Sequence, residues 1–178
     1  MLIPRQAVPA LKIETLAHGT FDLQAQTPEF ATLVVFYRGL HCPICATYLK
    51  ELQRLMPDFA ERGIHPIAIS SDTKERAEEF VKRADLNALP VGYGLPLAEA
   101  RKWGLYISTS RGPTSIGIDE PALFSEPGLF FVKPDHTLYF GSVQTMPFSR
   151  PVFKDMLPSL DFVKKVDYPA RGEYTGAV

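Results

Sequence analysis

Residues 36–45 read FYRGLHCPIC and contain the only two cysteines of the chain, Cys42 and Cys45, at a CxxC spacing. An apolar run, TLVVFY at residues 32–37, precedes the cysteines and has the length and β-branched content of a buried strand. After the cysteines, apolar residues recur at the spacing of an amphipathic helix: Leu49, Leu52, Met56 and Phe59. We therefore predict that the two cysteines lie where a strand turns into a helix.

This position predicts thiol chemistry. Pro43 suits the first helical position because it lacks the amide hydrogen that would have no partner there, so Cys42 is expected at the N-cap and Cys45 in the first turn. Unpaired amides and the positive end of the helix dipole favour a thiolate over a thiol. The sequence thus favours a redox pair over two cysteines that are merely buried, which is the simpler reading of any two cysteines.

Metal binding is not expected. A structural zinc site needs four ligands, and the chain has no second CxxC or HxxxH to complete one. The histidines occur singly: His18, His41, His65 and His136. His41 adjoins Cys42 and would favour the thiolate if it were protonated, while an ordinary solvent-facing histidine is an equally good interpretation. No cofactor is expected.

Composition excludes some partners. The 178 residues carry 19 basic and 20 acidic side chains, and a net charge of −1 gives no reason to expect nucleic acid or an anionic membrane as a partner. No run of 18 apolar residues exists, and the first residues lack the apolar core of a signal peptide. We therefore expect a soluble, cytoplasmic protein. In a reducing compartment, a CxxC pair is expected to cycle between dithiol and disulfide.

The remaining elements predict a single domain over residues 1–178, with a loose lead-in at about 1–10 and an irregular tail at about 169–178. A small hairpin is expected within 12–23, a helix over 43–62 that Pro57 kinks or splits after Met56, and a second buried strand over 64–70. A polar helix should follow from residue 74 to 84, capped from Ser70, Ser71 or Asp72. The rest should comprise a loop or short strand at 91–96, a short helix over 98–103, a long irregular stretch over 105–127, a hairpin over 129–140 and a helix over 150–166 interrupted near Pro158.

The order of these elements matches an α/β, thioredoxin-like fold with a central mixed β-sheet flanked by helices. The segment FYRGLHCPICATYLKEL resembles the active-site region of peroxiredoxin-like proteins of the AhpC/TSA class, and the resemblance continues through IAISSDTKERAEEF and EPGLFFVKPDHTLYFGSV. Aligned with the PxxxTxxC signature of that family, Cys45 takes the place of the peroxidatic cysteine, Cys42 that of the threonine and Arg38 that of the proline. Glu126 stands where the family's catalytic arginine would be, which leaves Arg38 and Arg111 as candidates to supply a positive charge.

The thioredoxin pattern fits as well. Thioredoxin-like proteins carry a cis proline before the hairpin strand, and Pro127 before GLFFV resembles that residue. A cis proline facing the cysteines would leave backbone groups free to bind an extended substrate chain. A trans proline that merely opens a strand is the alternative.

Two chemical routes follow, and both end in a Cys42–Cys45 disulfide. In thiol–disulfide exchange, Cys42, expected to be the more exposed sulfur, attacks a substrate disulfide and Cys45 resolves the mixed disulfide. In a thiol peroxidase, the Cys45 thiolate is oxidised by hydrogen peroxide or an alkyl hydroperoxide and condenses with Cys42. A third reading is a non-catalytic binding module with a groove around Trp103, Phe124 and Phe130.

The expected partners differ between these routes. They are a protein disulfide or a peroxide as substrate and a thiol reductant such as a thioredoxin or glutathione system. A homodimer is implied only by the resemblance.

Overall fold

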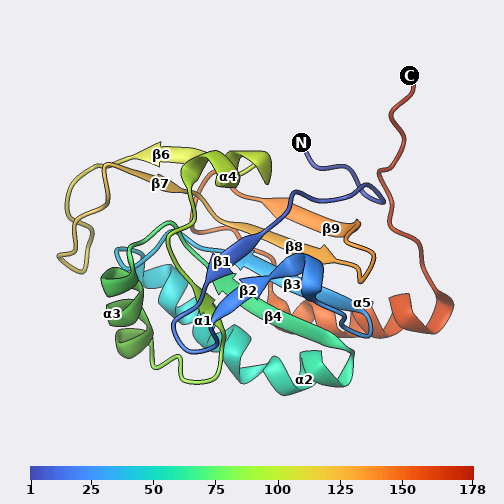
Figure 1. Ribbon diagram of the computed structural model, residues 1–178, viewed down its shortest axis with the longest axis horizontal. Helices are drawn as coiled ribbons and strands as arrows, with labels where there is room; N and C mark the ends of the chain where they lie inside the picture. Colours follow the sequence, from blue (N-terminus) through green and yellow to red (C-terminus); the bar gives the residue numbers. More distant parts are fainter.

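The computed structural model describes all residues, 1–178, and its central element is strand β3 (Ala31–Phe36), in which every residue is buried. β3 pairs in parallel with β4 and antiparallel with β8, within a five-stranded sheet of order β5-β4-β3-β8-β9 (Figure 1). The other strands of this sheet are β4 (Ile64–Ile69), β5 (Val91–Gly92), β8 (Gly128–Val132) and β9 (Leu138–Val143). The mixed sheet confirms the predicted thioredoxin-like fold class.

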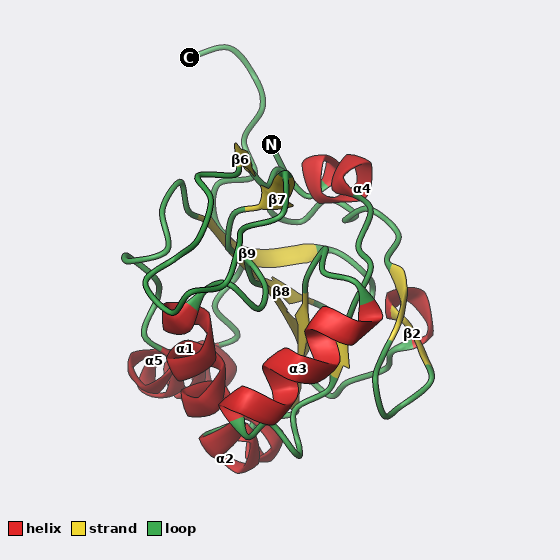
Figure 2. Ribbon diagram, turned by 90° about the vertical axis from the view of Figure 1, so that its left-hand side faces the viewer, coloured by secondary structure: helices red, strands yellow, loops and turns green.

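Helices cover both faces of this sheet, as Figures 1 and 2 show. One face packs against α1 (Pro43–Arg54), α2 (Met56–Glu61), α3 (Lys74–Ala84) and α5 (Phe153–Val166). The other face packs against α4 (Leu97–Lys102) and the hairpin of β1 (Lys12–Glu14) and β2 (Thr20–Asp22), which is followed by the 3-10 turn η1 (Leu23–Ala25). Alternate residues of β3 belong to the two resulting cores, as expected of a strand buried on both faces.

The break between α1 and α2 follows from Pro57. The expected split after Met56 occurs one residue earlier, at Leu55, because Pro57 then lies in the first turn of α2, where a missing N–H group costs no helical hydrogen bond. Gly63 follows α2 with a positive φ of 71° and donates its N–H to the Ala60 carbonyl, which confirms the expected glycine at this helix end.

Three expectations about helix ends and the lead-in are wrong. Thr73, rather than Ser70, Ser71 or Asp72, caps α3. α5 begins at Phe153 and continues through Pro158, because its buried face holds the helix against the sheet despite the missing hydrogen bond; this face comprises Phe153, Leu157 and Leu160. The first residues are not loose: the Arg5 and Val8 N–H groups bond to carbonyls at the β8–β9 turn and the first residue of β9.

The stretch 105–127 is less irregular than expected. It contains the two-stranded antiparallel sheet of β6 (Ile107–Thr109) and β7 (Leu123–Ser125). In Figure 1, these strands lie on the side of the central sheet that also carries α4. The segment between them returns towards the α1 N-terminus, where the Glu120 carboxylate binds the Arg38 side chain.

No helix of the structure is long and apolar enough to cross a membrane.

Candidate functional site

The two cysteines occupy the predicted positions at the start of α1. Cys42 is the N-cap residue, with extended backbone, and its Sγ accepts a hydrogen bond from the Cys45 N–H at 3.3 Å. Pro43 occupies the first turn, as predicted. Both thiols are free and both are buried, Cys42 with 2% of its surface exposed and Cys45 with none. Cys42 is the more exposed of the two sulfurs, as expected, but the margin is small and both are buried.

An arginine that the sequence did not indicate completes the site. Arg150, three residues before the start of α5, places Nη2 3.1 Å from the Cys45 Sγ and 3.8 Å from the Cys42 Sγ. Its Nε donates to the Pro147 carbonyl, and the charges that favour its protonated form come from the two sulfurs. No carboxylate is bound to Arg150, so the thiol pair is the anionic partner of this half-buried guanidinium.

These contacts give the two thiols different pKa values. Burial opposes charge on Cys45, but hydrogen bonds from Cys42 and Arg150, the Arg150 charge and a backbone bond from Arg38 outweigh it and lower the Cys45 pKa to about 6. The pKa of Cys42 is raised because its thiol donates to Cys45 and because it is itself buried. Cys45 is therefore the thiolate and Cys42 the protonated thiol, opposite to the roles that we expected for the disulfide-exchange route.

His41 does not act through positive charge. Its side chain is fully buried and packs on the Phe124 ring at 4.6 Å, and burial together with the nearby Arg38 charge lowers its pKa to about 4. A neutral imidazole cannot favour the thiolate electrostatically, so neither the solvent-facing interpretation nor the protonated one describes His41.

Arg38 lies beside the site, but its guanidinium is paired with two carboxylates. Its Nη2 is 3.0 Å from Glu120 Oε1, its Nε is 3.4 Å from Glu126 Oε2, and its guanidinium covers the Phe124 ring. Glu126 also accepts a hydrogen bond from the Ser108 hydroxyl. The Glu126 carboxylate is thus paired with Arg38, and it is absent from the charges that act on the Cys45 pKa.

Arg111 is exposed and has no contact with either sulfur; its backbone N–H donates to Glu120. Arg150 therefore supplies the charge for which Arg38 and Arg111 were the candidates.

Pro127 has a trans peptide bond, so the expectation of a cis proline is wrong. The chain passes from β7 to β8 in nearly extended form, with the Glu126 N–H bound to the Tyr106 carbonyl, and trans is the ordinary form of an X–Pro bond in such a connection. The expected groove of the binding-module reading is also missing, because its three aromatic side chains are buried and pack in the core: Trp103, Phe124 and Phe130.

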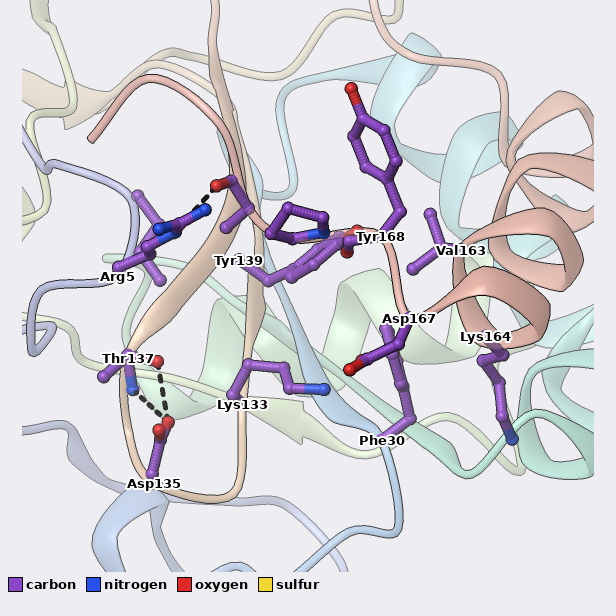
Figure 3. A pocket seen from close by; sticks show the side chains of 13 residues that line it. Arg5, Phe30, Lys133, Asp135, Thr137, Tyr139, Val163, Lys164, Asp167 and Tyr168 are labelled. Atoms are coloured by element: carbon purple, nitrogen blue, oxygen red, sulfur yellow. Dashed lines mark hydrogen bonds between the residues drawn. The ribbon is translucent and has the colours of Figure 1, made fainter. Parts of the chain in front are cut away.

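A cavity of about 320 Å³ lies at the other end of β3, away from the thiols (Figure 3). Phe30, which immediately precedes β3, lines it, whereas the cysteines follow that strand. The Lys133 ammonium lies 3.9 Å from the Phe30 ring centroid, and burial lowers its pKa. The cavity contains neither cysteine and is separate from the redox site.

Gly39 shapes the loop that carries the cysteines. It has a φ of +126°, and a Cβ atom at this position would collide with the Asp72 carboxylate, which accepts the Leu40 N–H at 2.7 Å and binds Arg76. We expect Gly39→Ala to destabilise the protein by about 2 kcal/mol or more, since a strained φ alone costs about 1–3 kcal/mol. Urea unfolding measures the loss.

Gly117→Ala is the matched control for this substitution, because Gly117 also has a positive φ but open space around it. Equal losses in the two variants would show that the contact with Asp72 does not matter.

The lowered pKa of Cys45 predicts the pH dependence of the reduced protein. The ultraviolet absorbance of the thiolate should titrate with a midpoint near pH 6, and this step should disappear in Cys45→Ser. The pKa of Cys45 is about 9 in the unfolded chain and about 6 in the folded protein, so ionisation of Cys45 stabilises the fold fully above pH 9. This stabilisation is lost as the pH falls through 6. The unfolding free energy of the wild type, relative to Cys45→Ser, should therefore fall between pH 9 and pH 6; a constant difference would contradict the assignment.

A thioredoxin-like sheet with a buried, polarised dithiol at the start of its first long helix defines a thiol-dependent oxidoreductase. The model of the AhpC/TSA family matches residues 4–140, and the chain belongs to this family. No curated protein sequence matches the chain significantly.

Solved structures with the same fold have low sequence identity. A reduced 2-Cys peroxiredoxin from Plasmodium vivax superposes with a TM-score of 0.74 at 13% identity, covering 100% of this chain and 92% of its own. A cysteine-to-serine mutant of peroxiredoxin 6 from Arenicola marina gives 0.71 at 18% identity, covering 94% and 76%. A yeast mitochondrial 1-Cys peroxiredoxin, studied for thiol resolution via glutathione/thioredoxin systems, gives 0.71 at 13% identity, covering 94% and 78%. At these identities the likeness shows the fold.

Proposed function

We propose that this protein is a thiol peroxidase in which Cys45 attacks the hydroperoxide and Cys42 resolves the product. The observation that carries the proposal is the position of the Arg150 guanidinium, 3.1 Å from the Cys45 Sγ. It stabilises the attacking thiolate and provides a cation beside the oxygen atoms on which negative charge develops as the O–O bond breaks.

The reaction balances with these two residues and an external dithiol. The Cys45 thiolate attacks one oxygen of ROOH; the S–O bond forms, the O–O bond breaks, and the leaving RO⁻ takes up a proton to give ROH. The resulting Cys45 sulfenic acid condenses with the Cys42 thiol, forming the S–S bond and releasing water. Two thiols from a reductant then reduce the disulfide, returning Cys42 and Cys45 to the dithiol and leaving the reductant oxidised.

Burial of the sulfurs favours a small oxidant. With Cys45 fully buried and Cys42 2% exposed, a peroxide molecule needs less opening of the site than the disulfide of a folded protein. Thiol–disulfide exchange remains the second candidate, because a dithiol at CxxC spacing on a helix N-terminus forms the same disulfide. In that case the attacking sulfur is Cys45, since the raised pKa keeps Cys42 protonated.

The reductant that we propose is a small thiol or a thioredoxin-like protein, as the thioredoxin and glutathione systems provide. A reducing compartment such as the cytoplasm would sustain this cycle and an antioxidant role. A homodimer is a further part of the proposal, supported by Phe140 and Val143, which are exposed on the edge strand β9.

The test is peroxide consumption by the reduced protein, followed by stopped flow without any reductant. We expect fast loss of one peroxide per dithiol, with mass spectrometry showing a Cys42–Cys45 disulfide by the loss of two hydrogen atoms. Protein alkylated at both thiols is the control. Slow reaction with both hydrogen peroxide and cumene hydroperoxide, together with rapid reduction of insulin disulfides, would reject the peroxidase function and favour thiol–disulfide exchange.

A further inference from the structure

Tyr48 links the start of α1 to the segment that carries Arg150. It lies one helical turn after Cys45 and is half-buried. Its hydroxyl donates to the Pro151 carbonyl at 2.7 Å, its ring lies 5.0 Å from the Arg150 guanidinium carbon, and the same ring stacks on Phe153 with centroids 4.2 Å apart. A single side chain of the cysteine helix thus contacts Arg150 and two residues that follow it in the chain, Pro151 and Phe153.

Arg150 needs such an anchor. It comes from a segment more than 100 residues away in sequence, and the only hydrogen bonds of its side chain are to the Pro147 carbonyl and the two sulfurs. The five N–H donors of a guanidinium on a long side chain allow many alternative geometries, and the entropy of ordering that side chain opposes the contact with Cys45. An aromatic face beneath the guanidinium and a hydrogen bond to the next backbone unit reduce this freedom.

We propose that Tyr48 is a positioning residue that holds Arg150 against the two sulfurs and thereby sets the ionisation of Cys45. Tyr48 does not touch the reacting sulfur; it acts through Arg150. The role deepens the proposed peroxidase function, yet it concerns the reduced protein alone, because the ionisation of Cys45 can be measured without any substrate.

The experiment measures the Cys45 pKa, by thiolate absorbance and by the pH dependence of iodoacetamide alkylation, in Tyr48→Phe and Tyr48→Leu. Tyr48→Phe keeps the ring and removes the hydrogen bond, while Tyr48→Leu removes both contacts. We expect the thiolate fraction at neutral pH to fall about twofold in Tyr48→Phe and about tenfold in Tyr48→Leu. A close cation lowers the pKa of an acidic group by about 1–3 units, so moving Arg150 away should raise the Cys45 pKa by part of that amount. Tyr139→Phe is the matched control, because that hydroxyl also donates to a backbone carbonyl, of Tyr168 at 2.8 Å.

A double-mutant cycle separates positioning from plain packing of α1 against α5. In an Arg150→Met background, Tyr48→Leu should leave the Cys45 pKa where Arg150→Met alone puts it, because the residue through which Tyr48 acts is gone. An unchanged pKa in both single Tyr48 variants, or shifts that add in the double variant, would overturn the proposal. If Tyr48→Leu fails to fold, Tyr48→Phe and its double variant decide by the same criteria. Slow peroxide reduction by a wild type with a Cys45 pKa near 6 would count against the peroxidase and leave the role of Tyr48 standing.

Discussion

Cys45→Ser is expected to abolish peroxide reduction, whereas Cys42→Ser should retain a single turnover. The structure places the thiolate on Cys45, where Arg150 and Cys42 both donate to the sulfur, and a serine hydroxyl at that position has no comparable nucleophilicity. In Cys42→Ser the Cys45 sulfenic acid still forms but finds no thiol to condense with. Stopped-flow peroxide oxidation with dimedone trapping measures both variants.

The labelling pattern decides which sulfur attacks. Dimedone should label Cys42→Ser stoichiometrically and leave Cys45→Ser unlabelled, and neither variant can form the internal disulfide. Label on Cys45→Ser would assign the attack to Cys42 and contradict the ionisation order described above. The same pair of variants tests disulfide exchange, since Cys42→Ser should trap a mixed disulfide on Cys45.

The strand–helix junction was predictable because every signal for it is local. Three signals lie within about 30 residues of one another: the apolar run of β3, Pro43 in the first turn and the helical spacing after it. Each favours a particular backbone conformation through the side chains of that segment alone. The N-cap position of Cys42 follows from these signals, and so does a lowered thiol pKa at one of the two cysteines. Which cysteine it is depends on contacts that the local sequence does not contain.

Arg150 was missed for the same reason. It is 105 residues from Cys45, at the expected start of the last helix, and only the packing of α5 beside α1 brings it to the sulfurs. The one local hint was a lone arginine before a proline at the start of an amphipathic segment, which is equally typical of a surface loop. His41 shows the reverse case: its place beside Cys42 suggested a charge effect, but Phe124 from β7 buries the ring and keeps it neutral.

Arg150→Met is expected to lower the rate of peroxide reduction at neutral pH by more than about 100-fold. Burial raises the pKa of Cys45, and the guanidinium offsets part of this effect. Without the guanidinium, the pKa of the thiol should rise by about 1–3 units from its value near 6. The variant also lacks the cation beside the breaking O–O bond, and one such donor contributes about 100-fold or more to a rate. Second-order rate constants measured from pH 5 to pH 10, together with the thiolate titration, separate the two effects.

Alkaline pH should restore only the part of the rate that ionisation explains. Above the new pKa of Arg150→Met, Cys45 is again a thiolate, so a remaining deficit measures the contribution of Arg150 to the transition state. Arg150→Lys keeps the charge without the forked donors, and its rate constant should lie between those of the wild type and Arg150→Met. Arg111→Met is the control, since the Arg111 side chain is exposed and makes no hydrogen bond to either sulfur, and it should match the wild type. Full activity of Arg150→Met at neutral pH would mean that another group ionises Cys45, and only Cys42 and the Arg38 backbone would remain to do so.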